Sequence, residues 1–182
     1  MDNRRLLMFV ATTLIAVGAG TARLAAGTPS LAAVPKDASR SPVEQVDAGR
    51  TRALRATTWR WQTVIGLRRS HFWSPLDTRR ALRFWQRQAR HMRRLAARPR
   101  HKSGWLCIHR YEGSWSDGGD PYWGGLQMDR GFMLRYAPRL LLRRGFANRW
   151  TPLEQMWVAE RAYRSGRGFY AWPSTAHACG LL

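Results

Sequence analysis

Residues 104–128 read GWLCIHRYEGSWSDGGDPYWGGLQM, and this stretch decides how the C-terminal part of the chain can fold. Trp105, Ile108 and Glu112 are spaced three and four residues apart, so they share one face of a helix. Ser103 is a suitable N-cap for that helix. A loop rich in Gly, Ser and Asp follows and leads into an aromatic and glycine-rich run. The stretch therefore predicts a helix with a carboxylate at its C-terminal end, next to an irregular loop.

Three more helices are predicted downstream, over residues 129–136, 139–145 and 151–166. Asp129 is in the position of an N-cap for the first of them. The last begins with TPLE at 151–154, which is a capping box with proline in the favoured first helical position. The C-terminal part is thus expected to be mostly helical.

Upstream, the chain is unusually rich in arginine between Arg50 and Arg100, with fifteen arginines and a single acidic residue, Asp77. We predict one helix over roughly 52–67 and a second that begins near Ser74-Pro75, where Ser would cap and Pro would occupy the first turn. The apolar residues of the second helix fall on one face: Leu82, Trp85, Ala89, Met92 and Ala96. Residues 50–102 are therefore expected to form a basic helical appendage.

The N-terminus has the order of a secretory signal peptide over residues 1–27. Two arginines, Arg4 and Arg5, precede an apolar run from Leu6 to Val17, and small residues follow. We expect export, with cleavage at a site that the sequence does not define; a retained leader would act as a membrane anchor. Residues 28–49 are rich in Ala, Ser and Pro and are expected to form a flexible linker.

The formal net charge of +20 at pH 7 predicts attraction to polyanions. Three interpretations of the arginine-rich segment are open: a solvated face on a helix that docks on the core, an amphipathic helix at a membrane surface, and a nucleic-acid patch. Export and the lack of a groove-reading motif argue against nucleic acid. We expect retention on anionic wall polymers or on an anionic membrane surface, and no nucleic-acid partner.

Cys107 and Cys179 are the only cysteines of the chain. An even pair in an exported protein usually forms a disulfide, and two unrelated buried thiols are the alternative. The histidines are scattered, none accompanies a Cys-x-x-Cys pair, and no glycine-rich phosphate loop is present. The sequence therefore predicts neither a metal nor a cofactor.

Several motifs resemble the transglycosylase-like domain of resuscitation-promoting factors. They are YEGSW at 111–115, YWGGLQM at 122–128, the helix that begins with TPLE, and Trp-Pro at 172–173. The resemblance covers about residues 104–182. It implies a reduced lysozyme-like fold of the α+β class, mostly helical, over 103–182, and an activity that cleaves the glycan strands of peptidoglycan.

The resemblance also makes Glu112 the catalytic acid. Cleavage of a glycosidic bond needs a protonated carboxylic acid at the leaving oxygen, and apolar walls from Tyr111 and Trp115 would favour the protonated form, as a tryptophan does in lysozyme. The alternative is a solvated glutamate at a helix terminus. One departure from the family is that its first cysteine commonly adjoins the catalytic Glu, whereas Cys107 lies five residues earlier.

Three nearby acids could supply a second carboxylate: Asp117, Asp120 and Asp129. Turn formation explains the first two equally well, and N-capping explains the third. A hydrolase would need such a group or a positioned water. A lytic transglycosylase needs only one Glu, because the sugar itself closes a 1,6-anhydro ring, and we favour this single-Glu mechanism.

Binding of the glycan is expected to use aromatic faces and hydrogen-bonding groups. The candidates for substrate binding are Tyr122, Trp123 and Trp172 for stacking, Gln127 for the N-acetyl groups, and Gly125, with Gly124, for close approach of the backbone. Each could equally belong to the core, and Trp157 on its amphipathic helix is expected to do so. Two other functions stay open: a non-catalytic wall-binding or signalling module, and, if the leader is misread, a basic nucleic-acid-binding protein.

Overall fold

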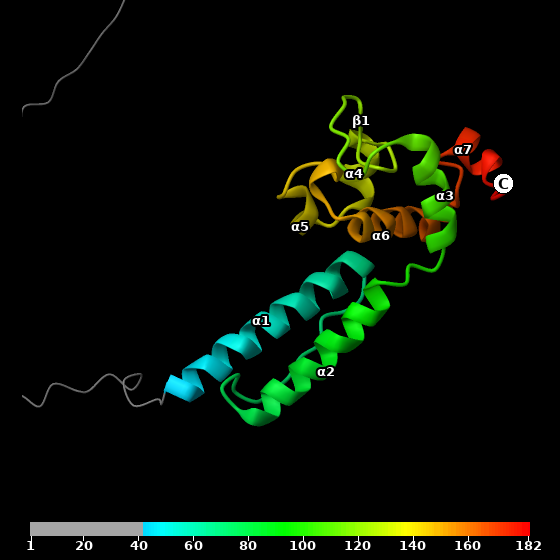
Figure 1. Cartoon of the computed structure of the whole chain (residues 1–182). Helices are drawn as coiled ribbons and strands as arrows, with labels where there is room; N and C mark the ends of the chain where they lie inside the picture. The colour runs from blue at the N-terminus through cyan, green and yellow to red at the C-terminus, as the bar shows by residue number, and fades with distance from the viewer. Residues whose placement is uncertain (1–41) are drawn as a thin grey trace, which may run out of the picture. The chain divides into compact units, whose positions relative to one another are not determined.

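Seven α-helices and one pair of short strands make up residues 42–182, the part of the chain that the computed structural model describes (Figure 1). The helices are α1 (Pro42–Ile65), α2 (Arg79–Ala96), α3 (Lys102–Glu112), α4 (Arg130–Tyr136), α5 (Arg139–Leu142), α6 (Pro152–Ala162) and α7 (Pro173–Ala178). Two short turns, η1 (Ala147–Arg149) and η2 (Tyr163–Arg167), complete the helical part, and β1 (Tyr122–Trp123) pairs antiparallel with β2 (Met128–Asp129). The structure is mostly helical, which is compatible with the predicted α+β class.

The predicted signal peptide at 1–27 and the first part of the predicted linker lie outside the described residues. The rest of the linker prediction, over 42–49, is wrong, because α1 already begins at Pro42. Ala48 and Thr51 are buried, and α1 packs along α2. Tertiary packing therefore makes this segment helical although its composition is that of a linker.

The helices α1 and α2 lie side by side and run in the same direction (Figure 1). The chain between them returns along the pair: the indole Nε1 of Trp59 donates to the Ser70 carbonyl at 2.9 Å. Farther along, Phe72 stacks on Phe84 with ring centroids 4.6 Å apart. Residues 66–78 therefore act as a strap, and both helices point their C-terminal ends at α6.

Two helix starts differ from the prediction. α2 begins after Thr78, whose hydroxyl accepts from the Ala81 N–H at 3.1 Å, while Ser74-Pro75 belong to the turn before it. α3 begins after His101 and not after Ser103, because the His101 N–H donates to the Glu160 Oε1 at 2.6 Å. The first start depends on the Thr78 hydroxyl and the second on the Glu160 carboxylate, and the prediction included neither group.

Other local signals are confirmed. The Asp129 carboxylate accepts from the Phe132 N–H at 2.7 Å and begins α4. At the start of α6, Thr151 and Glu154 form the complete capping box. α3 ends at Glu112, with Gly113 as its C-cap.

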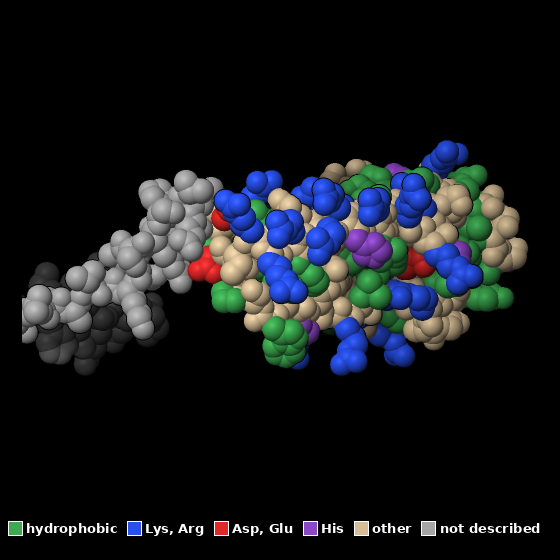
Figure 2. All heavy atoms as spheres, turned by 90° about the horizontal axis from the view of Figure 1, so that it is seen from below, with side chains coloured by type: hydrophobic (Ala, Val, Ile, Leu, Met, Phe, Trp, Pro, Cys, Tyr) green, Lys and Arg blue, Asp and Glu red, His purple; other side chains and the backbone are tan. Residues whose placement is uncertain are grey.

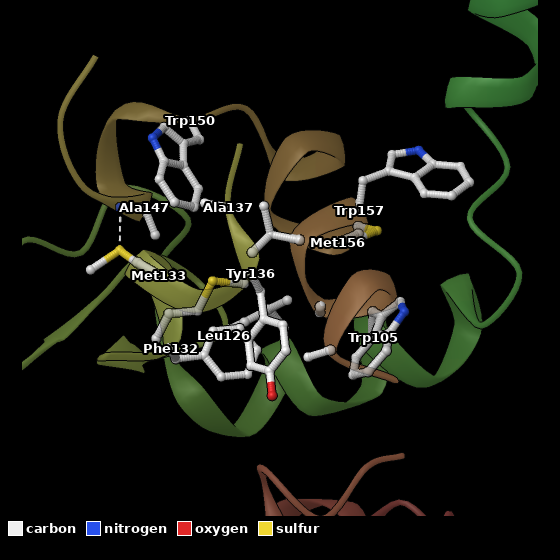
Figure 3. Packing of buried hydrophobic residues seen from close by; sticks show 14 of the residues in the cluster. Trp105, Leu126, Phe132, Met133, Tyr136, Ala137, Ala147, Trp150, Met156 and Trp157 are labelled. Carbon is white, nitrogen blue, oxygen red and sulfur yellow. Dashed lines mark hydrogen bonds between the residues drawn. The ribbon is translucent and has the colours of Figure 1, made fainter. Parts of the chain in front are cut away.

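The core of the molecule joins the basic helices to the C-terminal part. Trp105, Met156 and Trp157 are buried members of this core (Figure 3), as expected for Trp157. From α2, Met92 and Ala96 belong to the same cluster, and the Trp157 indole donates to the Ala96 carbonyl at 2.9 Å. The described residues accordingly form one compact unit, and the boundary suggested at 102/103 does not divide it. The apolar stripe of α2 docks on the core at its C-terminal end.

Glu154 links three elements although its side chain is fully buried. Its Oε1 accepts from Arg60 of α1 and from Arg144, each at 2.6 Å, and its Oε2 accepts from the Thr151 N–H at 2.8 Å. Burial by itself would raise the pKa of Glu154, but the hydrogen bonds from Arg60, Thr151 and Arg144 outweigh it and hold the pKa below its ordinary value.

Replacing Glu154 by Gln is expected to cost about 3 kcal/mol of unfolding free energy, the lower end for a broken buried pair. The lower end applies because the two arginine side chains keep 42% and 39% exposure and can be solvated. Since the folded pKa is lowered, the contribution of Glu154 is complete above the ordinary value of 4.5 and is lost as the pH falls below it. Denaturant unfolding from pH 7 to pH 3 measures both effects. Parallel pH curves for the two proteins would contradict this role.

Candidate active site

Glu112 lies at the C-terminal end of α3 and lines a surface pocket of about 300 Å³. We call this the Glu112 pocket; its walls include Glu112, Tyr122, Gln127, Trp172 and Thr175. Glu112 is half-buried, so its carboxylate can meet a bound molecule and still contact the protein. The structure brings together four of the predicted site residues here.

Thr175 contacts the carboxylate directly, and the sequence analysis missed it. Its hydroxyl donates to the Glu112 Oε1 at 2.8 Å across α3 and α7. The predicted disulfide between Cys107 and Cys179 is confirmed and joins the same two helices. Thr175 lies about one helical turn before Cys179, and Glu112 lies about one and a half turns after Cys107. An antiparallel pairing of the two helices around the disulfide could have revealed this contact.

The loop after α3 brings one aspartate next to the pocket. Gln127 donates from its Nε2 to the Asp117 Oδ2 at 2.7 Å and to the Gly124 carbonyl at 3.0 Å. A Cβ on Gly113 would lie 3.4 Å from that same Asp117 oxygen. Asp117 also accepts from the Gly119 N–H, which is the predicted turn-forming role. Asp117 is therefore tied into the loop beside Glu112.

Gln127 has a left-handed backbone, with φ 45°, which is uncommon for a residue with a side chain. Its two hydrogen bonds hold the amide against the pocket wall. Such constrained residues are often found at functional sites. The predicted contact of Gln127 with the N-acetyl groups stays a prediction.

The aromatic candidates divide into three situations. Tyr122 is exposed and lines the pocket. Trp172 also lines it, but only 5% of its surface is exposed and its indole donates to the Leu126 carbonyl at 2.6 Å, so it is mainly a core residue. Trp123 packs against Phe146, at 4.5 Å between ring centroids, and does not line the pocket.

Gly125 is buried, so its predicted place against the glycan is wrong. A Cβ there would lie 2.6 Å from the Nδ1 of His109 and 2.7 Å from the ring of Trp115. Those two rings stack at 3.9 Å. Glycine is needed at this position because the backbone approaches the stacked pair. Trp115 thus packs on His109 and is not a wall of the Glu112 pocket, contrary to expectation.

Gln155 is a second residue that the sequence analysis missed. It is fully buried in α6, where its Oε1 accepts from the Gly125 N–H and its Nε2 donates to the carbonyls of Trp115 and Ala147. These contacts hold the backbone of the loop after α3 at Trp115 and Gly125, and that of η1 at Ala147. An amide satisfies a buried irregular backbone, and a glutamine directly after a capping box offers little sign of that role.

Comparison with protein-family models, with characterised proteins and with solved structures finds no match for this chain. The resemblance described above therefore depends on the motifs themselves. Within residues 42–182, no group of three or more His, Cys, Asp or Glu side chains is placed to hold a metal ion. In the same part of the chain, none of the helices combines the length and apolar character that crossing a membrane requires.

Proposed function

We propose that this chain is an exported enzyme that cleaves the glycan strands of peptidoglycan, with Glu112 as its general acid and base. The observation that carries the proposal is the half-buried Glu112 carboxylate in an open pocket, held by Thr175 and lying beside the constrained Gln127. A reduced lysozyme-like fold over 103–182 is part of the proposal. The order of the motifs and the disulfide between α3 and α7 support it.

In the proposed reaction the protonated Glu112 donates its proton to the glycosidic oxygen as the bond to the anomeric carbon breaks. The resulting carboxylate then accepts the proton of the sugar's own 6-hydroxyl as that oxygen attacks the anomeric carbon. The product is a 1,6-anhydro ring, and the enzyme recovers its proton. Asp117 is held by Gln127 and the Gly119 N–H, which favours one catalytic carboxylate over two.

Mass spectrometry of purified sacculi digested with the protein tests this proposal. We expect muropeptides that end in a 1,6-anhydro sugar, each one water lighter than the hydrolytic product. Products with reducing ends would support cleavage of the glycan strand but would show that the reaction is hydrolysis and not the single-Glu mechanism. Intact sacculi to which the protein still binds would favour the non-catalytic wall-binding module.

Thr175 is expected to position the Glu112 carboxylate, so Thr175→Val should lower kcat about tenfold, the effect of one hydrogen bond to a charged group. Val keeps the volume of Thr and removes only the donor. Thr175→Ser restores a hydroxyl and should restore most of the rate. Equal losses of kcat in both variants would show that the packing of the methyl group matters. A lower Tm for Val alone would show that the hydroxyl stabilises the fold and does not position the carboxylate.

The arginines of α2 suit the proposed retention on anionic wall polymers. Figure 2 shows basic side chains gathered over one face of the molecule. On α2, an exposed row follows helical spacing: Arg83, Arg87, Arg90 and Arg94. A chain beginning near Lys102 would test the segment poorly, since it would lose Met92 and Ala96 from the core and Arg60 from Glu154.

Neutralising that row to Gln is therefore the sharper experiment. Binding to sacculi should weaken and lose most of its dependence on salt, because exposed charges are screened within about 10 Å at 0.1 M salt. Cleavage of soluble glycan fragments should stay unchanged. A matched control neutralises four exposed arginines outside the row: Arg68, Arg98, Arg139 and Arg143. Equal weakening by both sets would show that only net charge matters, and unchanged binding would show a solvated face.

A further inference from the structure

A second pocket lies where the C-terminal end of α1 meets α4, α6 and η2. Its volume is about 420 Å³. We call it the arginine pocket; it is lined by Gly66, Arg135, Tyr136, Arg161, Arg164 and Ser165. None of these residues is acidic, and none lines the Glu112 pocket. The arginine pocket is thus a positively charged hollow separate from the proposed active site.

Backbone contacts hold two of the guanidiniums in place. Arg161 donates to the Tyr136 carbonyl at 2.7 Å and to the Thr63 carbonyl at 3.4 Å. Arg164 donates to the Ile65 carbonyl, in the last turn of α1, at 2.7 Å and to the Glu160 carbonyl at 3.3 Å. These bonds satisfy backbone groups that a helix end leaves open. A guanidinium has five N–H donors in a planar fork, so each arginine keeps donors that these contacts do not use. The backbone contacts therefore hold both guanidiniums in place and leave N–H donors available for a ligand.

Gly66 leaves room in front of these donors. Its φ of +87° is a left-handed conformation that favours glycine. A Cβ at Gly66 would lie 3.2 Å from the Arg161 Nη1 and 3.8 Å from the Arg164 Nη2. The Arg161 Nη1 and the Arg164 Nη2 therefore lie near the same point beside Gly66, and both residues line the pocket.

The electrostatics of the pocket point the same way. Burial lowers the pKa of Arg161, and the neighbouring charge of Arg164 lowers it further. The pKa of Tyr136 is also lowered, chiefly by a hydrogen bond with Ser165, with contributions from Arg167 and Arg135. Arg135 itself lies over the Tyr136 ring at 5.7 Å. The charges of Arg164, Arg135 and Arg167 contribute to these shifts, so several positive charges act on the same pocket.

We propose that the arginine pocket binds a phosphate ester group. Guanidinium forks match phosphate oxygens in geometry and charge, and the pocket has room for the group together with its ester substituents. An exported chain meets this chemistry in two places, the phosphodiester polymers of the wall and the headgroups of anionic lipids. The inference needs no catalytic activity at Glu112.

Titration calorimetry of the full chain with glycerol 3-phosphate tests the site, with Arg135→Gln as the main variant. Arg135 is exposed and holds no backbone carbonyl in the described residues, so the fold should survive its replacement. We expect the Kd to rise about tenfold, the effect of one charge-assisted hydrogen bond. Arg139→Gln is the matched control, since it removes one exposed charge from the neighbouring helix and should change the Kd less than about twofold.

Equal weakening of binding by both variants would attribute binding to the net charge of the chain and overturn the site. The site would also be overturned if neither glycerol 3-phosphate nor lipid vesicles bind in a saturable way. Co-sedimentation with phosphatidylcholine vesicles, with and without phosphatidylglycerol, identifies the source. Vesicle binding that weakens in Arg135→Gln and not in Arg139→Gln assigns a lipid headgroup. If Arg135→Gln leaves vesicle binding unchanged but raises the Kd for glycerol 3-phosphate as expected, the ligand is a soluble or wall-borne phosphate.

Discussion

Replacing Glu112 by Gln is expected to reduce cleavage of isolated cell walls by at least roughly 10²–10⁴-fold, the usual contribution of general acid–base catalysis. Gln keeps the size of the side chain and can still accept the hydrogen bond from Thr175. It cannot donate a proton to the leaving oxygen. The loss should therefore appear in kcat, while binding to sacculi stays as it was.

Asp117→Asn is the matched control for Glu112→Gln, since it neutralises the aspartate beside Gly113 and leaves an oxygen for Gln127. Under the single-Glu mechanism this variant should keep most of the activity. The Tm of both variants should remain close to that of the parent protein. Near-normal lysis by Glu112→Gln would remove Glu112 from the mechanism, and loss in Asp117→Asn alone would move the catalytic role to Asp117.

Removing the disulfide is expected to lower the unfolding free energy by about 4 kcal/mol in the chain-entropy account, because the bond closes a loop over 72 residues. The C107S/C179S double variant keeps small polar side chains at both ends. Urea unfolding of this variant and of the oxidised chain measures the difference. Titration of the oxidised protein under denaturing, non-reducing conditions should find no free thiol.

The same variant should lose activity at urea concentrations below its unfolding midpoint. The reason is that α7 carries Thr175 and the disulfide holds α7 against α3. The parent protein after reduction is the control, and it should behave like the double variant. Equal stability of the oxidised and reduced chains would show that the packing of α3 and α7 is sufficient. Two titratable thiols in the oxidised protein would contradict the disulfide between Cys107 and Cys179.

The sequence by itself was enough wherever a residue acts on its near neighbours. The capping box of Thr151 and Glu154 and the N-cap at Asp129 are such cases, and both are confirmed. The end of α3 at Gly113 depends likewise on one residue and its adjoining turn. The disulfide is a longer contact, but a chain with two cysteines allows only one pairing, so Cys107 and Cys179 could be matched without knowledge of the fold.

Apart from the disulfide, tertiary structure decided the features that depend on partners far along the chain. α1 packs along α2 and buries Ala48 and Thr51, although its first residues have the composition of a linker. α3 begins after His101, whose backbone N–H donates to Glu160, 59 residues away. The burial of Gly125 is of the same kind, and the contact between Thr175 and Glu112 follows only from the pairing of α3 with α7. Periodicity and capping describe a few consecutive residues, whereas these contacts arise only once the helices have packed, so no local pattern can encode them.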